Sequence, residues 1–388
     1  MTPTLRDRYA VAIVGGGIVG MFTAVHLARA GSGPVAVFER GFLSSGGSGR
    51  NGGGVRQQWE TPVTVRLAQE AVAAWRDFPA EYGYNPYFRQ GGYLFLAESD
   101  AEVAQLDRVA AAVRWAGLPL RRLDAAGASQ LAPALRLPGL RGGSYLSSDG
   151  TLYPFPALWG VYEEAVRLGV HVFTNAEVIG FDTANGRVSG VRLAQGRVGV
   201  DDVVNAAGGW SGLVSRLAGL EVPNVASRHE ILATEPMKPF LDPMVIRLSD
   251  GLYVSQTMRG ELVGGLTMPH PAGVVPGPPS SIAFLRRMSH SLLELFPNLA
   301  GLNVLRAWAG YYDETPDGMP VIGEDPRLPG FFHANGFGGH GFMLSPATSK
   351  RVARAVLGQS IDLPAEEFGP GRFLSPGRTT AVERLQPG

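Results

Sequence analysis

Cysteine is absent from this chain of 388 residues, and lysine is nearly absent. The lack of cysteine excludes disulfides, thiolate metal sites and cysteine nucleophiles. The only lysines are Lys238 and Lys350, so few amines are available for chemistry. The histidines His229, His270 and His290 show no metal-ligand spacing with any carboxylate, and we therefore expect no metal site.

Net charge and long hydrophobic runs are also lacking. The 34 basic and 34 acidic residues balance, which provides no basic field for a phosphate backbone, so we expect no nucleic-acid partner. No apolar run approaches the length needed to span a bilayer. The first predicted strand begins by Ala10, which leaves no room for a signal sequence ahead of it. We therefore expect a cytoplasmic protein without an integral membrane segment.

The stretch from residue 10 to residue 20, AVAIVGGGIVG, is the motif around which the rest of the sequence is organised. A short apolar run leads into Gly15, Gly17 and Gly20 at the spacing G-x-G-x-x-G, and a helical apolar pattern follows. Gly15 permits a tight turn, Gly17 lets the backbone approach a pyrophosphate, and Gly20 lets the helix pack near the strand. The pattern predicts a dinucleotide-binding turn, and the alternative is a tight turn without a ligand.

A second apolar strand is predicted over residues 35–38 and ends in Glu39. An acidic residue at this offset, roughly 20 residues beyond the glycine turn, binds the ribose hydroxyls of a dinucleotide. A Gly/Ser-rich run follows over residues 41–54, with Arg50 inside it and Arg56 just after it. Small side chains there suit a backbone that lies against a flat ring, and the alternative is a flexible linker.

Helices are predicted where a capping residue or a proline precedes an amphipathic pattern, and strands where β-branched runs lie between turn signals. The predicted helices cover residues 61 to about 76–78, 99–116, 124–131, 156–169, 211–218 and 281–295, and a long helix follows the glycine-rich turn at 336–341. The predicted strands cover residues 91–97, 170–173, 176–182, 187–193, 203–204 and 331–334. After Gly358 the chain is rich in proline and glycine, and a frayed tail is expected.

Residues from about 223 to 305 alternate short β-rich segments with turns, which predicts an antiparallel sheet separate from the parallel one. The segment 91–138 is predicted to be an insertion that leaves the first domain. We therefore predict an α/β protein. A Rossmann-type nucleotide-binding domain is assigned to residues 1–90, 139–222 and 306–388, and an α+β substrate-binding domain on an antiparallel sheet to residues 91–138 and 223–305.

Five stretches together carry a family resemblance. They are VAIVGGGIVG with Glu39, SGRNGGGVRQQW, VVNAAGGW, WAGYYDETPDGMPVIG and NGFGGHGFMLSP, in this order along nearly the whole chain. The sequence resembles the D-amino acid oxidase superfamily of FAD proteins, in the branch that holds sarcosine oxidase β-subunits, glycine oxidases and dye-linked L-proline dehydrogenases. The resemblance implies a Rossmann-type FAD domain and one bound FAD.

By this resemblance, the turn at Gly15 and the acid at Glu39 hold the adenosine half of FAD, and Val178 presents its backbone to the adenine. The loop SGRNGGG is expected along the isoalloxazine ring, and GFGGHGFM beneath its pyrimidine edge. A helix that starts near Phe342 then directs its positive end toward the flavin. The residues assigned to FAD are Gly15, Gly17, Ile18, Val19, Gly20, Glu39, Arg40, Ser48, Arg50, Asn51, Gly52, Gly53, Val178, Ala206, Ala207, Gly208, Trp210, Gly310, Gly336, Gly338, Gly339, His340, Gly341, Phe342 and Met343.

The sequence departs from the family pattern at positions that bear on chemistry. Pro154 stands where sarcosine oxidase β-subunits carry the histidine that bonds covalently to FMN, so we expect FAD to be held noncovalently. Monomeric oxidases of the branch carry an oxygen-activating lysine on a strand near Leu262, and this chain has none in that strand. They also bind the substrate carboxylate with a lysine where Met343 stands here. These departures leave the electron acceptor open.

The catalytic candidates are Arg56, His340, Tyr253 and Tyr311. By the resemblance Arg56 binds the substrate carboxylate, which a guanidinium fork suits, and the alternative is a surface or phosphate-facing arginine. His340 lies in the turn predicted to contact the flavin, and it either acts there or only donates to backbone. Tyr253, Trp308, Tyr311 and Tyr312 are candidates for the pocket lining, although such aromatic residues also form cores. No general base is assigned, because water can take the amine proton.

Three functions are compatible with these residues. The first is FAD-dependent oxidation of a small amino acid or N-alkyl amino acid, such as proline, sarcosine or glycine, by hydride transfer to flavin N5, giving an imine that hydrolyses. The second is an FAD-dependent 2-hydroxy acid dehydrogenase. The third is an FAD-binding electron-relay subunit of a larger complex. A small amino acid is the expected substrate, with an electron acceptor or a partner subunit as the expected partner.

Overall fold

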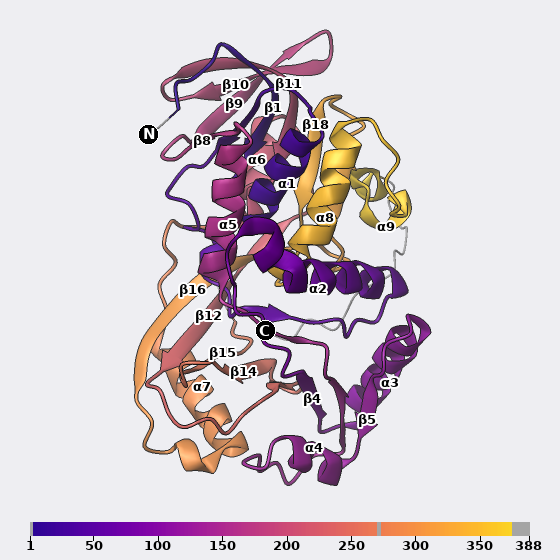
Figure 1. Cartoon of the computed structure of the whole chain (residues 1–388), viewed down its shortest axis with the longest axis vertical. Helices are drawn as coiled ribbons and strands as arrows, with labels where there is room; N and C mark the ends of the chain where they lie inside the picture. Colours follow the sequence, from indigo (N-terminus) through magenta and orange to yellow (C-terminus); the bar gives the residue numbers. More distant parts are fainter. Residues whose placement is uncertain (1–2, 270–272, 375–388) are drawn as a thin grey trace.

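Two β-sheets, one in each half of the molecule, organise the residues that the computed structural model describes, 3–269 and 273–374 (Figure 1). The first sheet has the strand order β17-β18-β11-β1-β2-β8, and β10 joins β11 to β9. Its strands are β1 (Arg8–Val14), β2 (Val35–Phe38), β8 (His171–Phe173), β9 (Val178–Ala184), β10 (Arg187–Leu193), β11 (Gly196–Asn205), β17 (Val321–Glu324) and β18 (Phe331–Asn335). The path from β18 to β8 is parallel throughout, which confirms the predicted Rossmann-type core.

The carboxyl ends of the central parallel strands lie at one edge of this sheet. Val14 of β1 pairs with Phe38 of β2 on one side and with Asn205 of β11 on the other. The segments that follow these strands, among them the glycine turn at Gly15 and the acid Glu39, therefore start side by side. Ligands of open α/β sheets bind at this edge.

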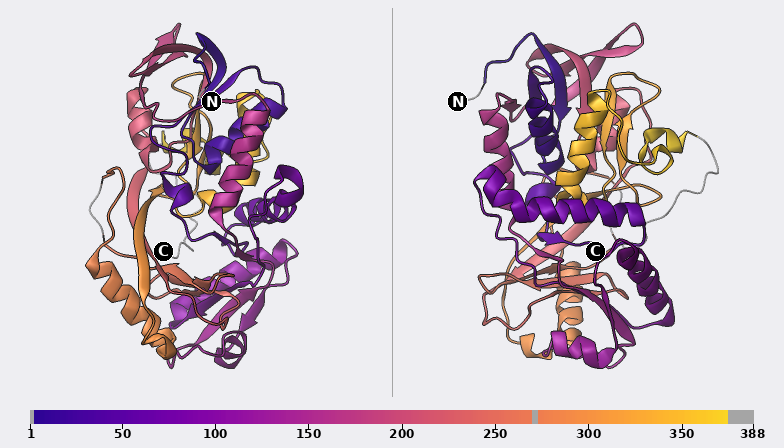
Figure 2. Two further views of the ribbon diagram at one scale, coloured as in Figure 1. Left: turned by 60° about the vertical axis from the view of Figure 1, so that its left-hand side comes forward. Right: turned by 45° about the vertical axis from the view of Figure 1, so that its right-hand side comes forward.

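Helices pack around the first sheet, and one helix lies between the two halves of the molecule (Figure 1). The helix α1 (Ile18–Arg29) packs against α8 (Gly341–Val356) and α5 (Pro154–Arg167). The helix α2 (Pro62–Tyr82) crosses the molecule between its two halves (Figures 1 and 2). In the part of the chain that the structure describes, no helix has the length and apolar character needed to cross a membrane.

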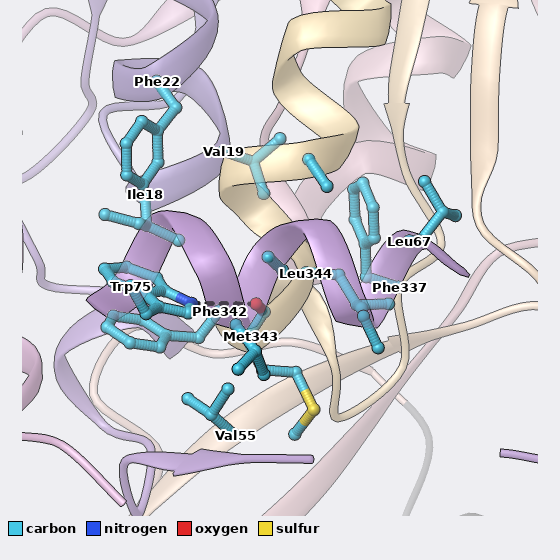
Figure 3. Packing of buried hydrophobic residues seen from close by; sticks show 14 of the residues in the cluster. Ile18, Val19, Phe22, Val55, Leu67, Trp75, Phe337, Phe342, Met343 and Leu344 are labelled. Atoms are coloured by element: carbon cyan, nitrogen blue, oxygen red, sulfur yellow. Dashed lines mark hydrogen bonds between the residues drawn. The ribbon is translucent and has the colours of Figure 1, made fainter. Parts of the chain in front are cut away.

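Aromatic packing against α2 fixes the start of α8 (Figure 3). The indole of Trp75 stacks on Phe342 with ring centroids 5.3 Å apart, and its Nε1 donates to the carbonyl of Met343 at 2.9 Å. Phe22 of α1 meets the same indole edge to face. All four side chains are buried, and full burial of a side chain of this size contributes roughly 2–3 kcal/mol. The N-terminus of α8 is therefore held firmly where the glycine-rich turn ends.

The second sheet has the strand order β16-β12-β15-β14-β13-β4-β6-β5. Its strands are β4 (Tyr93–Ala97), β5 (Arg121–Leu123), β6 (Gly142–Leu146), β12 (Val225–Thr234), β13 (Met244–Arg247), β14 (Leu252–Gln256), β15 (Leu262–Gly265) and β16 (Val304–Glu314). Neighbours run antiparallel, as predicted, except β13 and β4, which run parallel. The helices α3 (Asp100–Trp115), α4 (Ala125–Leu131) and α7 (Ile282–Leu295) pack with this sheet, and the long strands β12 and β16 reach toward the first sheet (Figure 2).

Two helices differ from the boundaries that the sequence predicts. The helix α2 continues to Tyr82 rather than ending near Phe78, because the Tyr82 ring stacks on Phe78 across Pro79. The helix α5 begins at Pro154 rather than at Pro156, since proline suits the first turn of a helix at either position.

Three strands also differ from the predicted boundaries. The strand β11 begins at Gly196 rather than at residue 203, because its first half pairs with β10. The strands β6 and β16 belong to the second sheet, although they lie wholly or mostly outside the segments 91–138 and 223–305. The division of the chain into two domains at those boundaries stays a prediction.

The segment after Gly358 is more ordered than the predicted frayed tail. The short helix α9 (Ala365–Phe368) buries Phe368. The guanidinium of Arg372 donates to Asp317 Oδ2 at 2.8 Å, which anchors a 3-10 turn beside β17. The remainder of the predicted tail, residues 375–388, lies outside the described residues.

Candidate active site

A cavity of about 740 Å³ lies between the carboxyl edge of the first sheet and a face of the second sheet. Ligand sites commonly have volumes of roughly 300–1,000 Å³. The catalytic candidates Arg56, Tyr253, Tyr311 and His340 all line this cavity, as does Tyr312. The prediction was wrong for Trp308, which lies outside the lining and donates from Nε1 to the carbonyl of Arg50 at 2.9 Å. The residues assigned to FAD that line it are Gly15, Gly17, Ile18, Val19, Glu39, Arg40, Ser48, Arg50, Asn51, Gly52, Val178, Ala206, Ala207, Gly208, Trp210, Gly310, Gly338, Gly339, His340, Gly341, Phe342 and Met343.

Glycines make the turn after β1 possible. Gly15 has a φ of +112°, and a Cβ there would lie 2.5 Å from the carbonyl oxygen of Ala206. A Cβ on Gly20 would lie 2.1 Å from the carbonyl oxygen of Gly15, so α1 packs directly over the turn. The chain therefore reaches the cavity as bare backbone at this point.

The N-terminus of α1 and the acid after β2 meet at the same wall. The N-cap of α1 is Gly17, which has no side chain to cap the helix, and the amide of Ile18 donates to Ser48 Oγ at 2.9 Å. The carboxylate of Glu39 is held in place because Gly16 N donates to one oxygen at 2.9 Å and Gly41 N to the other at 2.8 Å. The wall thus offers a positive helix end beside a fixed carboxylate.

The N-terminus of α8 forms another wall. His340 is its N-cap and provides no side-chain capping bond to the first-turn amides. The residues of that turn, Gly341, Phe342 and Met343, all line the cavity. A Cβ on Gly339 would lie 2.6 Å from the Tyr312 ring, which shows how closely the second sheet approaches this turn. The cavity is therefore bordered by the positive ends of two helices.

An aromatic cluster closes the end of the cavity near Glu39. The guanidinium of Arg40 lies over the Trp210 ring, 4.3 Å from its centroid. Tyr311 meets Trp210 edge to face, and its hydroxyl accepts from the amide of Val275 at 2.9 Å. Tyr311 therefore lies on the Trp210 side of the cavity, whereas its neighbour in sequence, Tyr312, faces Gly339.

Bare glycines in the loop before Arg56 let tyrosines of the second sheet come close. A Cβ on Gly52 would lie 3.2 Å from the Tyr253 ring, and one on Gly54 would lie 1.9 Å from the Tyr93 hydroxyl. Within the same loop, Arg50 Nε donates to Ser45 O and its Nη1 donates to Ala309 O, at 2.8 and 2.9 Å. The loop is thus a structured wall of the cavity and not a flexible linker, which was the alternative interpretation of its sequence.

Arg56 is fixed by contacts on several sides, and its side chain is only 2 % exposed. Its guanidinium lies 3.8 Å from the centroid of the Trp59 ring, and Nη1 donates to the carbonyl of Gln58 at 2.7 Å. Its Nη2 lies 3.2 Å from Nε2 of His340. Burial lowers the pKa of His340 well below its usual value, and the charge of Arg56 adds to this effect. The imidazole is therefore neutral and accepts from the guanidinium.

Three tyrosines of the second sheet line the cavity together with this arginine; Tyr93 is buried, whereas Tyr253 and Tyr312 are partly exposed. Burial raises the pKa of Tyr253 well above its usual value and that of Tyr312 to about 12. Burial likewise raises the pKa of Tyr93, which the charge of Arg56 partly opposes. Their hydroxyls therefore stay protonated near neutral pH and are available as hydrogen-bond donors. Beside them, His229 stacks on Tyr312 with ring centroids 3.7 Å apart.

Three residues assigned to FAD lie outside the cavity lining. Gly20 packs over Gly15, as described above. A Cβ on Gly53 would lie 2.0 Å from the carbonyl oxygen of Leu152, and one on Gly336 would lie 2.6 Å from Thr315 Cγ2. These three positions require glycine because the chain packs closely behind the site. They shape the turns and do not face the cavity.

Sequence reasoning missed several lining residues on the face of the second sheet. They are Tyr93, His229, Ile231, Met244 and Ile246. The alternation of His229 and Ile231 in VASRHEILAT was an available signal, because residues two apart on a strand share a face. Strand alternation alone does not tell which of the two faces is turned toward a ligand.

The donors and shape of this cavity fit FAD. The bare turn and two helix N-termini suit an anionic pyrophosphate, and the fixed carboxylate of Glu39 suits the ribose hydroxyls. The buried aromatic surface of the second sheet suits a planar ring system. Over residues 3–269 and 273–374, no group of three or more His, Cys, Asp or Glu side chains is placed to hold a metal ion.

Comparison with known families gives one match over most of the chain. A family model named DAO, described as FAD dependent oxidoreductase, matches residues 10–355. The chain is also 31% identical over 382 residues to the sarcosine oxidase subunit beta of Rhizobium meliloti (strain 1021), covering 96% of this chain and 90% of that protein. It is 29% identical over 365 residues to the glycine oxidase of Pseudomonas putida, covering 93% and 98% of the two chains.

Solved structures of related enzymes also superpose on nearly the whole chain. The crystal structure of L-proline dehydrogenase from P. horikoshii superposes with a TM-score of 0.88 at 34% identity, covering 95% of this chain and 99% of that one. The crystal structure of glycine oxidase from Geobacillus kaustophilus superposes with a TM-score of 0.85 at 25% identity, covering 96% and 100%.

Proposed function

This chain belongs to the DAO family of FAD-dependent oxidoreductases, and from this premise we propose that it oxidises the carbon–nitrogen bond of a small amino acid or N-alkyl amino acid. Proline, sarcosine and glycine are the substrate types that we favour. Relatives named for each of these three compounds align over nearly the whole chain. The observation that carries the proposal is the buried guanidinium of Arg56 on the cavity wall, held at a fixed orientation among tyrosine hydroxyls.

The substrate carboxylate binds to Arg56 in this proposal. Stacking on Trp59 and the bonds to Gln58 O and His340 hold the guanidinium plane, so little side-chain entropy remains to be lost on binding. The hydroxyls of Tyr253 and Tyr312 stay protonated because burial raises their pKa, and they add donors of suitable polarity. A small acid is thus oriented by one charge and two hydroxyls.

FAD would be held by the glycine turn, Glu39 and the starts of α1 and α8, and when bound it supplies the acceptor for a hydride from the substrate carbon. The chain contributes orientation and exclusion of water. The neutral His340 and the protonated tyrosines leave the substrate amine without a strong buried base, so the amine loses its proton to water before oxidation. The imine product then hydrolyses.

Anaerobic mixing of the purified protein with a panel of small acids tests this function directly. We expect proline, sarcosine or glycine to bleach the flavin absorbance, and lactate and glycolate to leave it unchanged. Bleaching by the hydroxy acids alone would overturn the proposal in favour of a 2-hydroxy acid dehydrogenase. A flavin that no acid bleaches would favour an electron-relay subunit.

FAD is held noncovalently in this proposal. The sequence has no cysteine, and Pro154 occupies the first turn of α5, where it offers no side chain for attachment. Precipitation with acid should therefore release all flavin into the supernatant. Colour that stays with the precipitated protein would overturn noncovalent binding.

The electron acceptor is a small molecule or a partner subunit in this proposal. The relative from Rhizobium meliloti is by name one subunit of a sarcosine oxidase, and this chain covers 90% of its length. Turnover of an amino acid with an artificial dye, in the absence of any other protein, would show that the chain needs no partner for the oxidation itself.

A further inference from the structure

We propose that Asp149 is a positioning residue of the carboxylate site, which fixes Arg56 through the side chains of Gln57 and Gln58. The inference rests on the proposed function, in which Arg56 receives the substrate carboxylate. Asp149 is itself fully buried at 0 % exposure and lies outside the cavity lining, so it acts on Arg56 without touching the substrate.

A small two-stranded ribbon brings Asp149 to the arginine. The strand β3 (Gly54–Val55) pairs antiparallel with β7 (Gly150–Thr151). Arg56 directly follows β3, and Asp149 directly precedes β7, so the register of the ribbon places the two residues at the same end. Residues far apart in the sequence thereby become neighbours with little freedom to slide.

Hydrogen bonds from three nitrogen atoms converge on the Asp149 carboxylate. Its Oδ1 accepts from the backbone amide of Gln57 at 2.7 Å and from Gln57 Nε2 at 3.2 Å. Its Oδ2 accepts from Gln58 Nε2 at 3.0 Å. An ionised carboxylate can accept all three bonds, because both of its oxygens are acceptors. The carboxamide of an asparagine has only one acceptor oxygen, and its NH2 group cannot accept from the glutamine nitrogens.

Gln58 connects Asp149 to Arg56 through its own hydrogen bonds. Its side-chain oxygen accepts from Ser144 Oγ at 2.7 Å, so both ends of the amide are held. Its backbone carbonyl accepts from Arg56 Nη1 at 2.7 Å. The segment continues into Trp59, whose indole Nε1 donates back to the carbonyl of Arg56 at 3.1 Å. A shift of Gln58 therefore moves the acceptor that orients the guanidinium.

Asp149 also carries a negative charge near Arg56. This charge weakens the binding of a substrate carboxylate, whereas the positioning of Arg56 strengthens it. Burial raises the pKa of the Asp149 carboxyl to about 7, and the hydrogen bonds of Gln58 and Gln57 and the charge of Arg56 oppose this rise. An anionic Asp149 repels a substrate carboxylate, so its removal as a charge alone would tighten binding. Its removal as a positioning residue would weaken binding, and the sign of the effect separates the two roles.

The test compares an acid with its amide in the holoenzyme. The affinities for propionate and propionamide are followed by the change in flavin absorbance, and KM and kcat for the reactive amino acid are measured beside them. For Asp149→Asn we expect normal FAD content, propionate affinity weaker by about 10- to 100-fold, and propionamide affinity nearly unchanged. KM should rise far more than kcat falls.

A second variant keeps the carboxyl group of Asp149 and breaks the positioning. Gln58→Met fills a similar volume but removes the side-chain bonds to Asp149, Ser144 and the carbonyl of Tyr93. It should weaken propionate binding in the same direction. Asp325→Asn is the matched control, because Asp325 is another fully buried carboxylate outside the cavity lining, which accepts from Arg327 Nε and Nη2 at 2.9 and 2.8 Å. The ratio of its affinity for propionate to its affinity for propionamide, the acid-to-amide ratio, should match that of the wild type.

The outcomes distinguish a failure of the role proposed for Asp149 from a failure of the proposed function. Tighter propionate binding in Asp149→Asn, or an unchanged acid-to-amide ratio in both Asp149→Asn and Gln58→Met, would overturn the positioning role. If Asp149→Asn does not fold, Gln58→Met alone decides. A wild type that no amino acid bleaches, but whose preference for propionate is lost in Gln58→Met, would refute the proposed function and still support the role of Asp149. A wild type without any preference for propionate would overturn both.

Discussion

The side chains of Arg56 and His340 meet at the wall of the cavity, with Nη2 of the arginine 3.2 Å from Nε2 of the histidine. Because burial lowers the pKa of His340, the ring is neutral, Nε2 accepts and Nδ1 carries the proton. His340 is also the N-cap of α8. The contact therefore joins the proposed carboxylate site to the helix that faces the proposed pyrimidine edge of the flavin.

Arg56→Lys is expected to weaken substrate binding far more than FAD binding. Lysine keeps the charge but loses the planar fork that donates to Gln58 O and His340 and stacks on Trp59. The loss of transition-state stabilisation should be on the order of 2 to 4 kcal/mol. The ratio of kcat/KM values and the FAD content per chain measure the two effects.

The matched control for this variant is Arg76→Lys. Arg76 is exposed and its recorded partner is the neighbouring Asp77, so the substitution should change neither kcat/KM nor FAD content. An Arg56→Lys enzyme that turns over every accepted carboxylate substrate as the wild type does would remove Arg56 from the site.

Gly20→Ala is expected to lower FAD occupancy even though Gly20 does not line the cavity. The added Cβ would lie 2.1 Å from the carbonyl oxygen of Gly15, so either the turn or α1 has to move. The flavin-to-protein absorbance ratio of the purified protein measures occupancy. Gly301→Ala is the control, because its Cβ would meet no heavy atom within 4 Å. Equal ratios in the two variants would contradict the structural role of Gly20.

The backbone half of the site could be predicted from the sequence, because local rules specify it. Gly15 and Glu39 follow directly from short buried strands, and parallel strands end at one sheet edge. The turn before Phe342 is recognisable for the same reason, since its glycines precede a long amphipathic helix. These features need only the identity of neighbouring residues and the handedness of the fold.

The side-chain half could not be predicted in the same way, because it depends on how the second sheet lies over the first. Tyr93 and His229 come from β4 and β12, which are distant in sequence and meet only through the intervening strands. The sequence around Asp149 has the composition of an ordinary turn. Its connection to Arg56 appears only when β3 pairs with β7.

The stability of the fold should depend on pH through His26 of α1. Its Nε2 atom is buried without a hydrogen-bond partner, and burial, with the nearby charge of Arg29, lowers its pKa to about 4. The unfolded chain takes up a proton at a pKa of about 6.5. As the pH falls from about 7 to about 5, the unfolded state binds this proton first, and the free energy of unfolding should decrease by about 2 kcal/mol.

His26→Asn removes this titration and keeps a side-chain donor. The free energy of unfolding is measured by urea denaturation near pH 7 and near pH 5. Its decrease between these two pH values should be about 2 kcal/mol smaller in the variant than in the wild type. His290→Asn is the control, because His290 is exposed and pairs only at the surface with Glu294, and its loss should match that of the wild type. An identical loss in His26→Asn would exclude His26 as the source.

The reduced enzyme should pass electrons to a dye faster than to oxygen. Oxygen reduction begins with superoxide, which a positive charge in a dry pocket stabilises strongly. Lys238 and Lys350 are both exposed and lie outside the cavity lining. The cations that line the cavity include Arg50 and Arg56, but both guanidiniums donate to carbonyl oxygens of the chain, and Arg56 is proposed to bind the substrate carboxylate. Burial keeps His340 neutral, and Arg259 lies at the surface against Glu261.

After reduction by substrate, reoxidation by an artificial dye should exceed reoxidation in air-saturated buffer by roughly tenfold or more. A matched pair of variants tests the cause. Ile231 is buried on the cavity face of β12, so Ile231→Lys introduces a cation there and Ile231→Met introduces a similar volume without charge. The lysine variant should react with oxygen faster than the methionine variant. If oxygen reoxidises the wild type as fast as the dye does, the predicted preference for the dye is refuted, and a cavity cation such as Arg50 becomes the oxygen-activating group to test next.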